Sequence, residues 1–427
     1  MNGFSYFFLL ALALAVIVQL WLARYHIAHV LAHRHRVPRP FAQRITLEAH
    51  QKAAAYSVSR TRFEIVALLY HSVLLLGWTL GGGLDWLEQA WRSLHWPALA
   101  NGIAVILSVL LITSLLELPL RIYHTFVIEQ RFGFNLTSPG LFTADLLREA
   151  LLTLLIATPL LALILWLMAG NDTMLRPLWW LYVWLAWNGF SLLMLWLYPA
   201  FIAPLFNRFT PLQDERLKER ITALLRRAGF TASGIFVMDG SRRSAHGNAY
   251  FSGLGRHKRI VFYDTLLNTL SADEIEAVLA HELGHFRHHH IHKRLAGTAL
   301  LSLAGLLILD ALLGQPWFYS GLGISQAAPH LGLLLFMFVT PVFTFFLTPV
   351  LLYFSRRQEF EADDYAARQA PPTTLASALL KLYQDNAATL TPDPLYSAFH
   401  DSHPPAPLRI ARLLDKSPPD TMDAHAH

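Results

Sequence analysis

Long apolar runs, separated by short polar stretches, make up most of this chain. A helix needs roughly 20 predominantly apolar residues to cross the hydrocarbon core of a bilayer. Seven runs reach that length: residues 4–23, 63–81, 100–120, 148–169, 177–199, 296–314 and 330–353. A buried helix of a large soluble core could explain one such run, but not seven of them. The pattern therefore predicts a mostly α-helical, polytopic membrane protein with seven transmembrane helices.

The basic residues between these runs indicate how the helices are oriented. The loop after the third run carries Arg121 and Arg131, whereas 315–329 has no charge. Outside 315–329, the alternate loops hold little beyond Arg92 and Arg176. Basic loops stay on the cytoplasmic side of a membrane, so we expect the N-terminus outside and the C-terminus in the cytoplasm. The loop after the first run is the most basic of all: Arg24, Arg34, Arg36, Arg39, Arg44, Lys52, Arg60 and Arg62.

Two polar segments are long enough to fold on the cytoplasmic side. The first begins with an amphipathic helix expected from Thr210 and Pro211 to about Ala228, since proline suits the first helical position. A later helix, which carries the motif described below, is expected to run directly into the sixth span. Short strand-like runs precede it at Gly234–Met238, Ala249–Ser252 and Arg259–Tyr263. The expected segments are an N-terminal region of five spans (1–199), a cytoplasmic segment (200–295), spans six and seven (296–353) and a second cytoplasmic segment (354–427).

Composition supports a membrane protein and narrows its chemistry. Hydrophobic residues make up 54% of the chain and charged residues 15%, values unlike those of a soluble enzyme. The chain has no cysteine, which excludes disulfides, thiolate metal ligands and a cysteine nucleophile. Any metal must therefore be held by histidines and carboxylates. The net charge of +5 is spread over loops, so it indicates topology and no nucleic-acid partner.

A helix with two histidines four residues apart is the most informative polar feature. His281 and His285 lie on one face of such a helix, so both imidazoles can reach one metal ion. The adjacent Glu282 can then accept a proton from a water molecule, as in zinc hydrolases. Ser271 and Glu274 fit a capping box that opens this helix. The spacing predicts a metal site with a general base beside it.

Two histidines leave zinc short of ligands, because catalytic sites usually take three protein groups. A histidine six residues past the second cannot supply the third, because Ile291 occupies that position. A glutamate from another helix can do so, and Glu359 follows the last span. Asp363, one turn later, can accept a hydrogen bond from a ligand imidazole and fix its tautomer. The neighbouring Glu361 and Asp364 point elsewhere on the helix and are expected to be solvated.

These motifs, with three further segments, resemble those of the type I CAAX prenyl endopeptidases, which are integral-membrane zinc proteases, and of their bacterial relatives. The further segments are RIYHTFVIEQRFGFN (121–135), GNAYF (247–251) and SHPP (402–405). The related heat-shock membrane proteases share the two metal motifs but are shorter and lack the long N-terminal multispan region.

The resemblance implies roles for individual residues. His281, His285 and Glu359 correspond to the ligands of one zinc ion per chain, and Glu282 to the general base. Asn248 and His403 match catalytic positions beside the scissile peptide that stabilise the oxyanion. The run Ala249–Ser252 is similar to the edge strand that pairs with substrate. The implied fold is a ring of seven helices around a water-filled chamber, with a cytoplasmic zincin-like α+β protease domain.

The roles of several polar residues have two interpretations. His288, His289 and His292 fall near the ligand face, so they fit either an accessory metal site or solvated histidines at the membrane edge; His290 has no assigned role. Asp310 and Glu117 lie within predicted spans and fit either a functional or a chamber-lining role. Nothing in the chain resembles a prenyl-recognition motif.

The sequence thus predicts a membrane-embedded zinc endopeptidase of the CAAX prenyl protease type that hydrolyses peptide bonds. Its expected partners are the lipid bilayer and a peptide or protein substrate that is prenylated or otherwise membrane-associated. One alternative is a quality-control protease of broad specificity, and another is a non-catalytic zinc-binding scaffold. The absence of a retention signal at the C-terminus favours a bacterial inner membrane over the endoplasmic reticulum, with the active site facing the cytoplasm.

Overall fold

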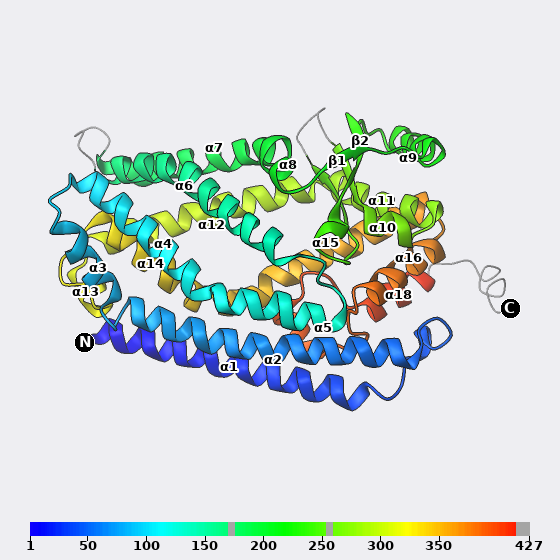
Figure 1. Ribbon diagram of the computed structural model, residues 1–427, viewed down its shortest axis with the longest axis horizontal. Coiled ribbons are helices and arrows are strands. Elements are labelled where there is room, and N and C mark those ends of the chain that lie inside the picture. The colour runs from blue at the N-terminus through cyan, green and yellow to red at the C-terminus, as the bar shows by residue number, and fades with distance from the viewer. Residues whose placement is uncertain (170–175, 253–258, 416–427) are drawn as a thin grey trace.

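The predicted spans are long helices that run along the longest axis of the molecule (Figure 1). The computed structural model describes residues 1–169, 176–252 and 259–415. Within these residues, six helices are long and apolar enough to cross a membrane, and a pair bent by 46° brings the total to seven. That pair is α2 (Leu47–Trp78) with α3 (Gly83–Arg92). The others are α1 (Gly3–His33), α4 (Ala98–Tyr123), α6 (Pro139–Ala169), α7 (Trp179–Leu197), α12 (His290–Leu313) and α14 (Pro329–Thr344), which continues into α15 (Thr348–Gln369).

These helices bury little of their apolar surface against one another. Between 6% and 33% of the most apolar window of each of the six is buried, as expected for helices that have lipid on one side and a chamber on the other. The predicted mostly helical, polytopic fold is therefore confirmed. Short helical pieces join the spans: α5 (Gln130–Phe132), α8 (Ala203–Phe206) and α13 (Pro316–Gly321).

Two intramembrane carboxylates have partners in neighbouring helices. Trp179 Nε1 donates a hydrogen bond to Asp310 Oδ1 at 2.6 Å. Glu117 Oε1 lies 3.5 Å from His71 Nε2. These contacts join α7 to α12 and α2 to α4, so both carboxylates contribute to packing between spans.

A small mixed sheet lies at one end of the helices, with strand order β1-β2-β4-β3. Its central pair, β2 (Gly234–Met238) and β4 (Arg259–Tyr263), is parallel. The outer strands, β1 (Phe209–Pro211) and β3 (Ala249–Ser252), pair antiparallel. All three predicted strands are confirmed with their predicted bounds, and Ala249–Ser252 is an edge strand.

Helices pack around this sheet and share one apolar core with it. They are α9 (Glu215–Arg227), α10 (Asp264–Thr269), α11 (Ala272–Arg287), α16 (Pro372–Asp385) and α18 (Ala406–Leu414). Helix α17 (Pro394–His400) packs instead against α1 and α15. Buried core residues come both from 200–295, such as Phe262 and Leu279, and from the last part of the chain, such as Leu375 and Ile410. The two polar segments therefore fold together.

Two predicted helix boundaries were wrong. Helix α9 begins at Glu215, because the Asp214 side chain caps it by accepting a hydrogen bond from the Leu217 N–H at 3.0 Å. Pro211 lies instead in β1, an edge strand, where the missing N–H is tolerated. The motif helix does not run into the sixth span: α11 ends at Arg287, and His289 has φ +55° before α12 starts at His290.

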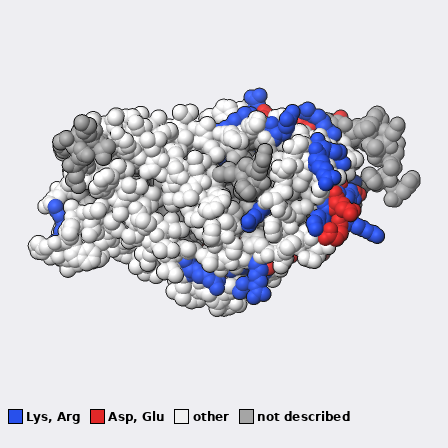
Figure 2. Space-filling model, turned by 90° about the horizontal axis from the view of Figure 1, so that it is seen from above, with Lys and Arg blue, Asp and Glu red and all other residues white. Residues whose placement is uncertain are grey.

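Charge is distributed unevenly over the face shown in Figure 2. Lysine, arginine and acidic side chains gather at the end that holds the sheet, and most of the remaining surface in that view is uncharged. The uncharged part corresponds to the spans in Figure 1.

Candidate functional site

Helices α11 and α15 bring three candidate metal residues together. His281 and His285 lie on the face of α11 that packs against α15, and Glu359 projects from α15 toward them. The two Nε2 atoms are 3.3 Å apart. Each also lies 3.4 Å from a Glu359 oxygen. Among the described residues, this is the group of histidine and carboxylate side chains that could hold a metal ion.

The spacing of these atoms fits a tetrahedral metal. For bonds of about 2.0–2.1 Å, a tetrahedron has edges of about 3.3–3.4 Å. The separation of the two Nε2 atoms matches this value, as does the distance from each Nε2 to one Glu359 oxygen, Oε2 for His281 and Oε1 for His285. Glu359 Oε2 is buried and faces three nitrogen atoms: His403 Nδ1 at 2.8 Å, His281 Nε2 at 3.4 Å and Arg409 Nη1 at 3.5 Å. A buried carboxylate that faces the Nε2 atoms of two imidazoles is well suited to bind a cation.

Close packing of the two helices depends on a glycine. A Cβ at Gly284 would lie 2.8 Å from the Cα of Ala362 and 3.0 Å from its carbonyl oxygen. Both residues are buried, one turn from the candidate metal residues. The absence of a side chain at Gly284 thus sets how closely Glu359 approaches the imidazoles.

The second nitrogen of His281 is held by a buried ion pair. His281 Nδ1 lies 2.8 Å from Asp363 Oδ1, as the sequence predicted for Asp363. Asp363 accepts two hydrogen bonds from Arg409 of α18, at 2.6 and 2.9 Å. Burial disfavours a charged imidazole, but the hydrogen bonds that the His281 ring donates to the carboxylates of Asp363 and Glu359 raise its pKa to about 9. This position therefore favours positive charge, which a metal ion would supply.

Arg409 was missed by sequence reasoning. It is 5% exposed and lies in the amphipathic helix α18, where its neighbours Ala406, Ile410 and Leu413 are buried. The sequence did contain an indication: Arg409 lies on the same face of α18 as three apolar core residues, so it is expected to be buried. A buried arginine requires a carboxylate partner.

The second nitrogen of His285 contacts His290, the histidine without an expected role. His285 Nδ1 is 2.9 Å from His290 Nδ1, and His290 Nε2 is 3.0 Å from Glu361 Oε2. Glu361 was expected to be solvated; its side chain is 34% exposed, but it also contacts His290, because the turn after α11 brings His290 back onto the site. Asp364 is also paired, with Arg412 at 2.8 Å.

The remaining predicted site residues line the same cavity. Glu282, Asn248 and His403 surround a space of about 280 Å³ together with His281 and Glu359. His403 Nδ1 lies 2.8 Å from Glu359 Oε2. Asn248 directly precedes the edge strand β3. The rest of the lining is largely apolar and includes Leu266, Val278, Leu375, Leu379 and Leu382.

The loop that carries His403 is held by α17. His26 of α1 stacks on Tyr396 at 4.1 Å, and Tyr396 stacks on His400 at 3.9 Å. The Tyr396 hydroxyl donates to Glu64 at 2.9 Å. Arg356 of α15 donates to the carbonyls at the end of α17 and to that of Asp401. Two spans thus position the residues that precede His403.

The turn that carries Asn248 rests on the segment 121–135. Its residues His124–Glu129 form a π-helix, a feature frequent at functional sites. Glu129 accepts a hydrogen bond from the Tyr56 hydroxyl at 2.6 Å and lies 3.4 Å from His246 Nε2. Phe134 stacks on the His246 ring at 4.3 Å. Beside this cluster a larger cavity of about 980 Å³ adjoins Asn248 and His403.

Two family models match the chain. The model described as "CAAX prenyl protease N-terminal, five membrane helices" covers residues 26–208. The model of peptidase family M48 covers residues 211–417.

Curated relatives match over most of their length. The CAAX prenyl protease 1 homologs of Oryza sativa and Homo sapiens are 33% and 31% identical, covering 89% and 88% of this chain and 90% and 88% of theirs. CAAX prenyl protease 1 of Saccharomyces cerevisiae is 36% identical over 71% of this chain and 69% of its own. The crystal structure of S. mikatae Ste24p is similar with a TM-score of 0.90 and 29% identity, covering 97% of this chain and 99% of that one.

Proposed function

The chain belongs to peptidase family M48 and is a membrane-embedded metalloendopeptidase of the CAAX prenyl protease type, and from this premise we propose which residues carry out the reaction. One observation supports the assignment most directly. The Nε2 atoms of His281 and His285 are 3.3 Å apart and each lies 3.4 Å from a Glu359 oxygen. Glu282 lines a cavity together with His281 and Glu359.

We propose that these three side chains hold one Zn²⁺. Two imidazoles and a carboxylate are a preferred zinc set, and they leave a fourth position for water or substrate. When bound, zinc polarises a carbonyl and lowers the pKa of a coordinated water from about 15.7 to about 7. Asp363 and His290 hold the Nδ1 atoms of the two imidazoles, so each Nε2 keeps its lone pair for the metal.

Glu282 is proposed as the general base. It accepts a proton from the attacking water while the water oxygen forms a bond with the scissile carbonyl carbon. The C–N bond then breaks, and Glu282 returns the proton to the leaving amine. The second proton of the water passes from the new carboxyl group to that amine, so that one water is consumed and a carboxylate and an ammonium group are formed. Asn248 and His403 line the same cavity, and we propose that they donate hydrogen bonds to the oxyanion. One such donor is typically worth about 100-fold in rate or more.

The substrate is proposed to be a peptide that adds a strand to β3. Main-chain pairing with an edge strand gives affinity with little sequence preference, and β3 ends the sheet beside Asn248. The leucine and valine side chains near Glu282 offer an apolar pocket for an aliphatic residue. This chemistry fits the C-terminal aliphatic residues of a CAAX peptide that is prenylated or otherwise membrane-associated.

We further propose that the active site faces the cytoplasm. The basic loops after the first and third spans lie on the same side of the spans as the sheet. The segments 200–295 and 354–427 would then form one protease domain carried by the spans 1–199 and 296–353.

Metal analysis and product analysis together test this function. Purified protein should contain about one zinc per chain. It should release a single C-terminal tripeptide from a farnesylated CAAX peptide, faster than from the same peptide without the farnesyl group, as judged by mass spectrometry.

Two other outcomes would change the assignment. Heterogeneous internal cuts in unprenylated membrane proteins would favour a quality-control protease of broad specificity. Full rescue of a deletion strain by Glu282→Ala would favour a non-catalytic scaffold.

A further inference from the structure

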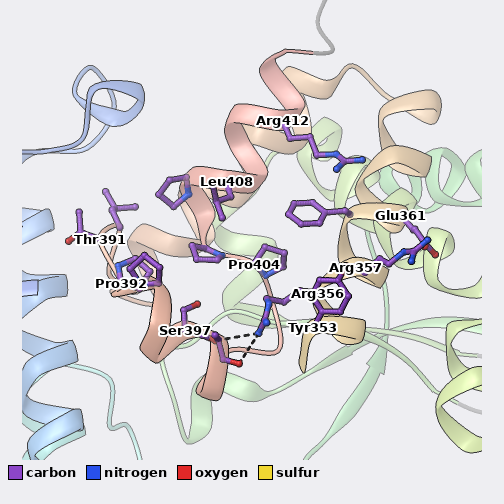
Figure 3. A pocket seen from close by; sticks show the side chains of 16 residues that line it. Tyr353, Arg356, Arg357, Glu361, Thr391, Pro392, Ser397, Pro404, Leu408 and Arg412 are labelled. Atoms are coloured by element: carbon purple, nitrogen blue, oxygen red, sulfur yellow. Dashed lines mark hydrogen bonds and ion pairs between the residues drawn. The ribbon is translucent and has the colours of Figure 1, made fainter. Parts of the chain in front are cut away.

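A second large cavity, of about 710 Å³, lies between α15, α17 and α18 (Figure 3). Helix α15 lines it with Tyr353, Arg356, Arg357 and Phe360. Each helical residue turns the chain by about 100°, so Arg357 points about 200° around the helix from Glu359. The cavity is therefore separate from the metal group and opens on another face of α15.

Most of its wall is apolar. Prolines from the loops on either side of α17, Pro392 and Pro404 among them, line the cavity together with Phe360 and Leu408. Leu408 is 59% exposed and Tyr353 is 58% exposed. Two large hydrophobic side chains are therefore exposed at the rim of the cavity. Such exposure is unfavourable in water but not at a membrane surface.

The cavity lies at the level of lipid headgroups. Tyr353 is the last residue of the seventh apolar run, and aromatic side chains are enriched at this interface. Arg356 and Arg357 follow by three and four residues, a rise of about 4.5–6 Å. The headgroup layer is about 5–8 Å thick on each side of a bilayer, so both guanidinium groups fall within it.

The charged groups of the wall are predominantly positive. Three arginines, Arg356, Arg357 and Arg412, line the cavity with one carboxylate, that of Glu361. Arg356 donates to three carbonyl oxygens, which leave its charge in place. Arg357 pairs with Glu361 at 3.3 Å and Arg412 with Asp364 at 2.8 Å, but their side chains are 67% and 44% exposed. Exposed pairs of this kind are weak and exchange readily for another anion.

We propose that this cavity binds an anionic phospholipid. The phosphate lies among the three arginines, and an acyl chain lies against Tyr353, Phe360 and Leu408. Charge and position favour this ligand. The arginines at the cytoplasmic surface attract a negatively charged headgroup, and the apolar wall beneath them accommodates its acyl chain.

A phospholipid bound in this cavity would affect the active site through Arg356. Its guanidinium group holds the carbonyls of Ser397, Ala398 and Asp401. Residue 401 lies two positions before His403. A phosphate beside Arg356 would therefore stabilise the loop that presents His403 to the metal group.

Lipid binding by the delipidated full chain in detergent tests the proposal. Native mass spectrometry would compare phosphatidylglycerol, phosphatidylcholine and inorganic phosphate. We expect phosphatidylglycerol to bind at least tenfold more tightly than phosphatidylcholine, and inorganic phosphate, which lacks the chains, not to displace it at millimolar concentration. Arg357→Gln and Arg412→Gln should each lower the affinity for phosphatidylglycerol about fivefold. The affinity for phosphatidylcholine should stay unchanged.

A matched pair of leucines controls for non-specific effects. Leu408→Asp should lower the affinity for phosphatidylglycerol at least tenfold, because it places a carboxylate, which repels the phosphate, at the rim of the cavity. Leu395→Asp, an exposed α17 position outside the cavity wall, should change binding less than twofold. Equal affinity for the two phospholipids, or unchanged binding in both Leu408→Asp and Arg412→Gln, would overturn the proposal. Displacement of phosphatidylglycerol by a farnesylated peptide in wild type but not in Leu408→Asp would show that the substrate occupies the cavity instead.

Discussion

Each imidazole of the candidate metal group presents Nε2 to the shared centre and Nδ1 to a partner of its own. His281 Nδ1 faces Asp363, and His285 Nδ1 faces His290, which reaches Glu361 through its other nitrogen. Hydrogen bonds donated outward along both chains end on carboxylates. This arrangement holds both rings in the tautomer that can bind a metal before any metal arrives.

The role of Glu282 can be separated from metal binding by one substitution. Glu282→Gln keeps the size and polarity of the side chain but removes the carboxylate that accepts a proton. We expect zinc content near that of wild type and a fall in kcat of about 10²–10⁴-fold. Metal analysis and peptide cleavage on the same preparation measure both. A variant that cleaves at nearly the wild-type rate would remove Glu282 from the mechanism.

Arg409 and Arg412 form a matched pair for testing the buried ion pair. Both extend from α18 to an aspartate of α15, but Arg409 is buried with Asp363 whereas Arg412 is exposed with Asp364. Arg409→Met should leave Asp363 buried and unpaired, weaken zinc binding by about 10–100-fold and destabilise the protein by about 3–5 kcal/mol. Arg412→Gln should change zinc binding less than twofold. Zinc titration against a competing chelator and thermal unfolding measure the two effects, and equal losses in both variants would contradict the prediction.

At the residue scale, the sequence indicated side chains whose spacing carries chemistry. His281, His285, Glu359 and Asp363 stood out because helical periodicity places them on common faces, and the structure brings them together. His290 and Glu361 did not, because their contact depends on the turn at His289 between α11 and α12. Local patterns do not encode where a helix that follows a turn will point.

At the element scale, the approach of α11 to α15 sets the metal geometry. Gly284→Ala would place a Cβ 2.8 Å from the Ala362 backbone, so the helices must separate by a fraction of an ångström or more. We expect a loss of about 1–3 kcal/mol in stability together with weaker zinc binding. Gly297→Ala in α12 is the control, since a Cβ there meets no atom within 4 Å and alanine favours a helix. Thermal unfolding and zinc titration should distinguish the two, and identical behaviour would contradict the steric argument.

The start of α11 should show a pH-dependent contribution to stability. Burial alone would raise the pKa of Glu274, but hydrogen bonds from Lys381, the Ser271 N–H and Ser377 hold it below its ordinary value of 4.5. A carboxyl group whose pKa is lower in the folded than in the unfolded protein stabilises the folded state at pH values above 4.5. This stabilisation is lost as the pH falls through the pKa that Glu274 has in the folded protein. Glu274→Gln should therefore lower the melting temperature at pH 7, by a difference that narrows toward pH 4. A difference independent of pH would contradict the assignment.

Elements with strong local signals were predicted well. The capping box of Ser271 and Glu274 opens α11 as expected, and the three β-branched and aromatic runs are strands. The start of α9 was predicted too early because Thr210 and Pro211 also suit an edge strand, and only pairing with β2 decides between them. Tertiary contacts override a local preference at such positions.

At the scale of the whole molecule, the apolar runs determine the architecture. Their number and length predicted the spans, because a bilayer requires long apolar helices. The cavities and their charged linings could not be predicted, since they depend on how α15, α17 and α18 pack. Arg356 illustrates this: its three carbonyl partners lie 41–45 residues away in the chain.

The orientation of the molecule can be tested directly because the chain has no cysteine. Single cysteines at Leu94, after α3, and at Glu219, on α9, lie at opposite ends of the spans and are exposed. The basic loops lie at the α9 end, so we expect a membrane-impermeant maleimide to label Leu94→Cys in intact cells and Glu219→Cys only after lysis. The cysteine-free parent controls for background, and retained peptidase activity shows that each variant is folded. Labelling of Glu219→Cys from outside would place the metal group on the other face of the membrane. The arginine-lined cavity would then face the outer leaflet, so this experiment also decides which leaflet must supply its lipid.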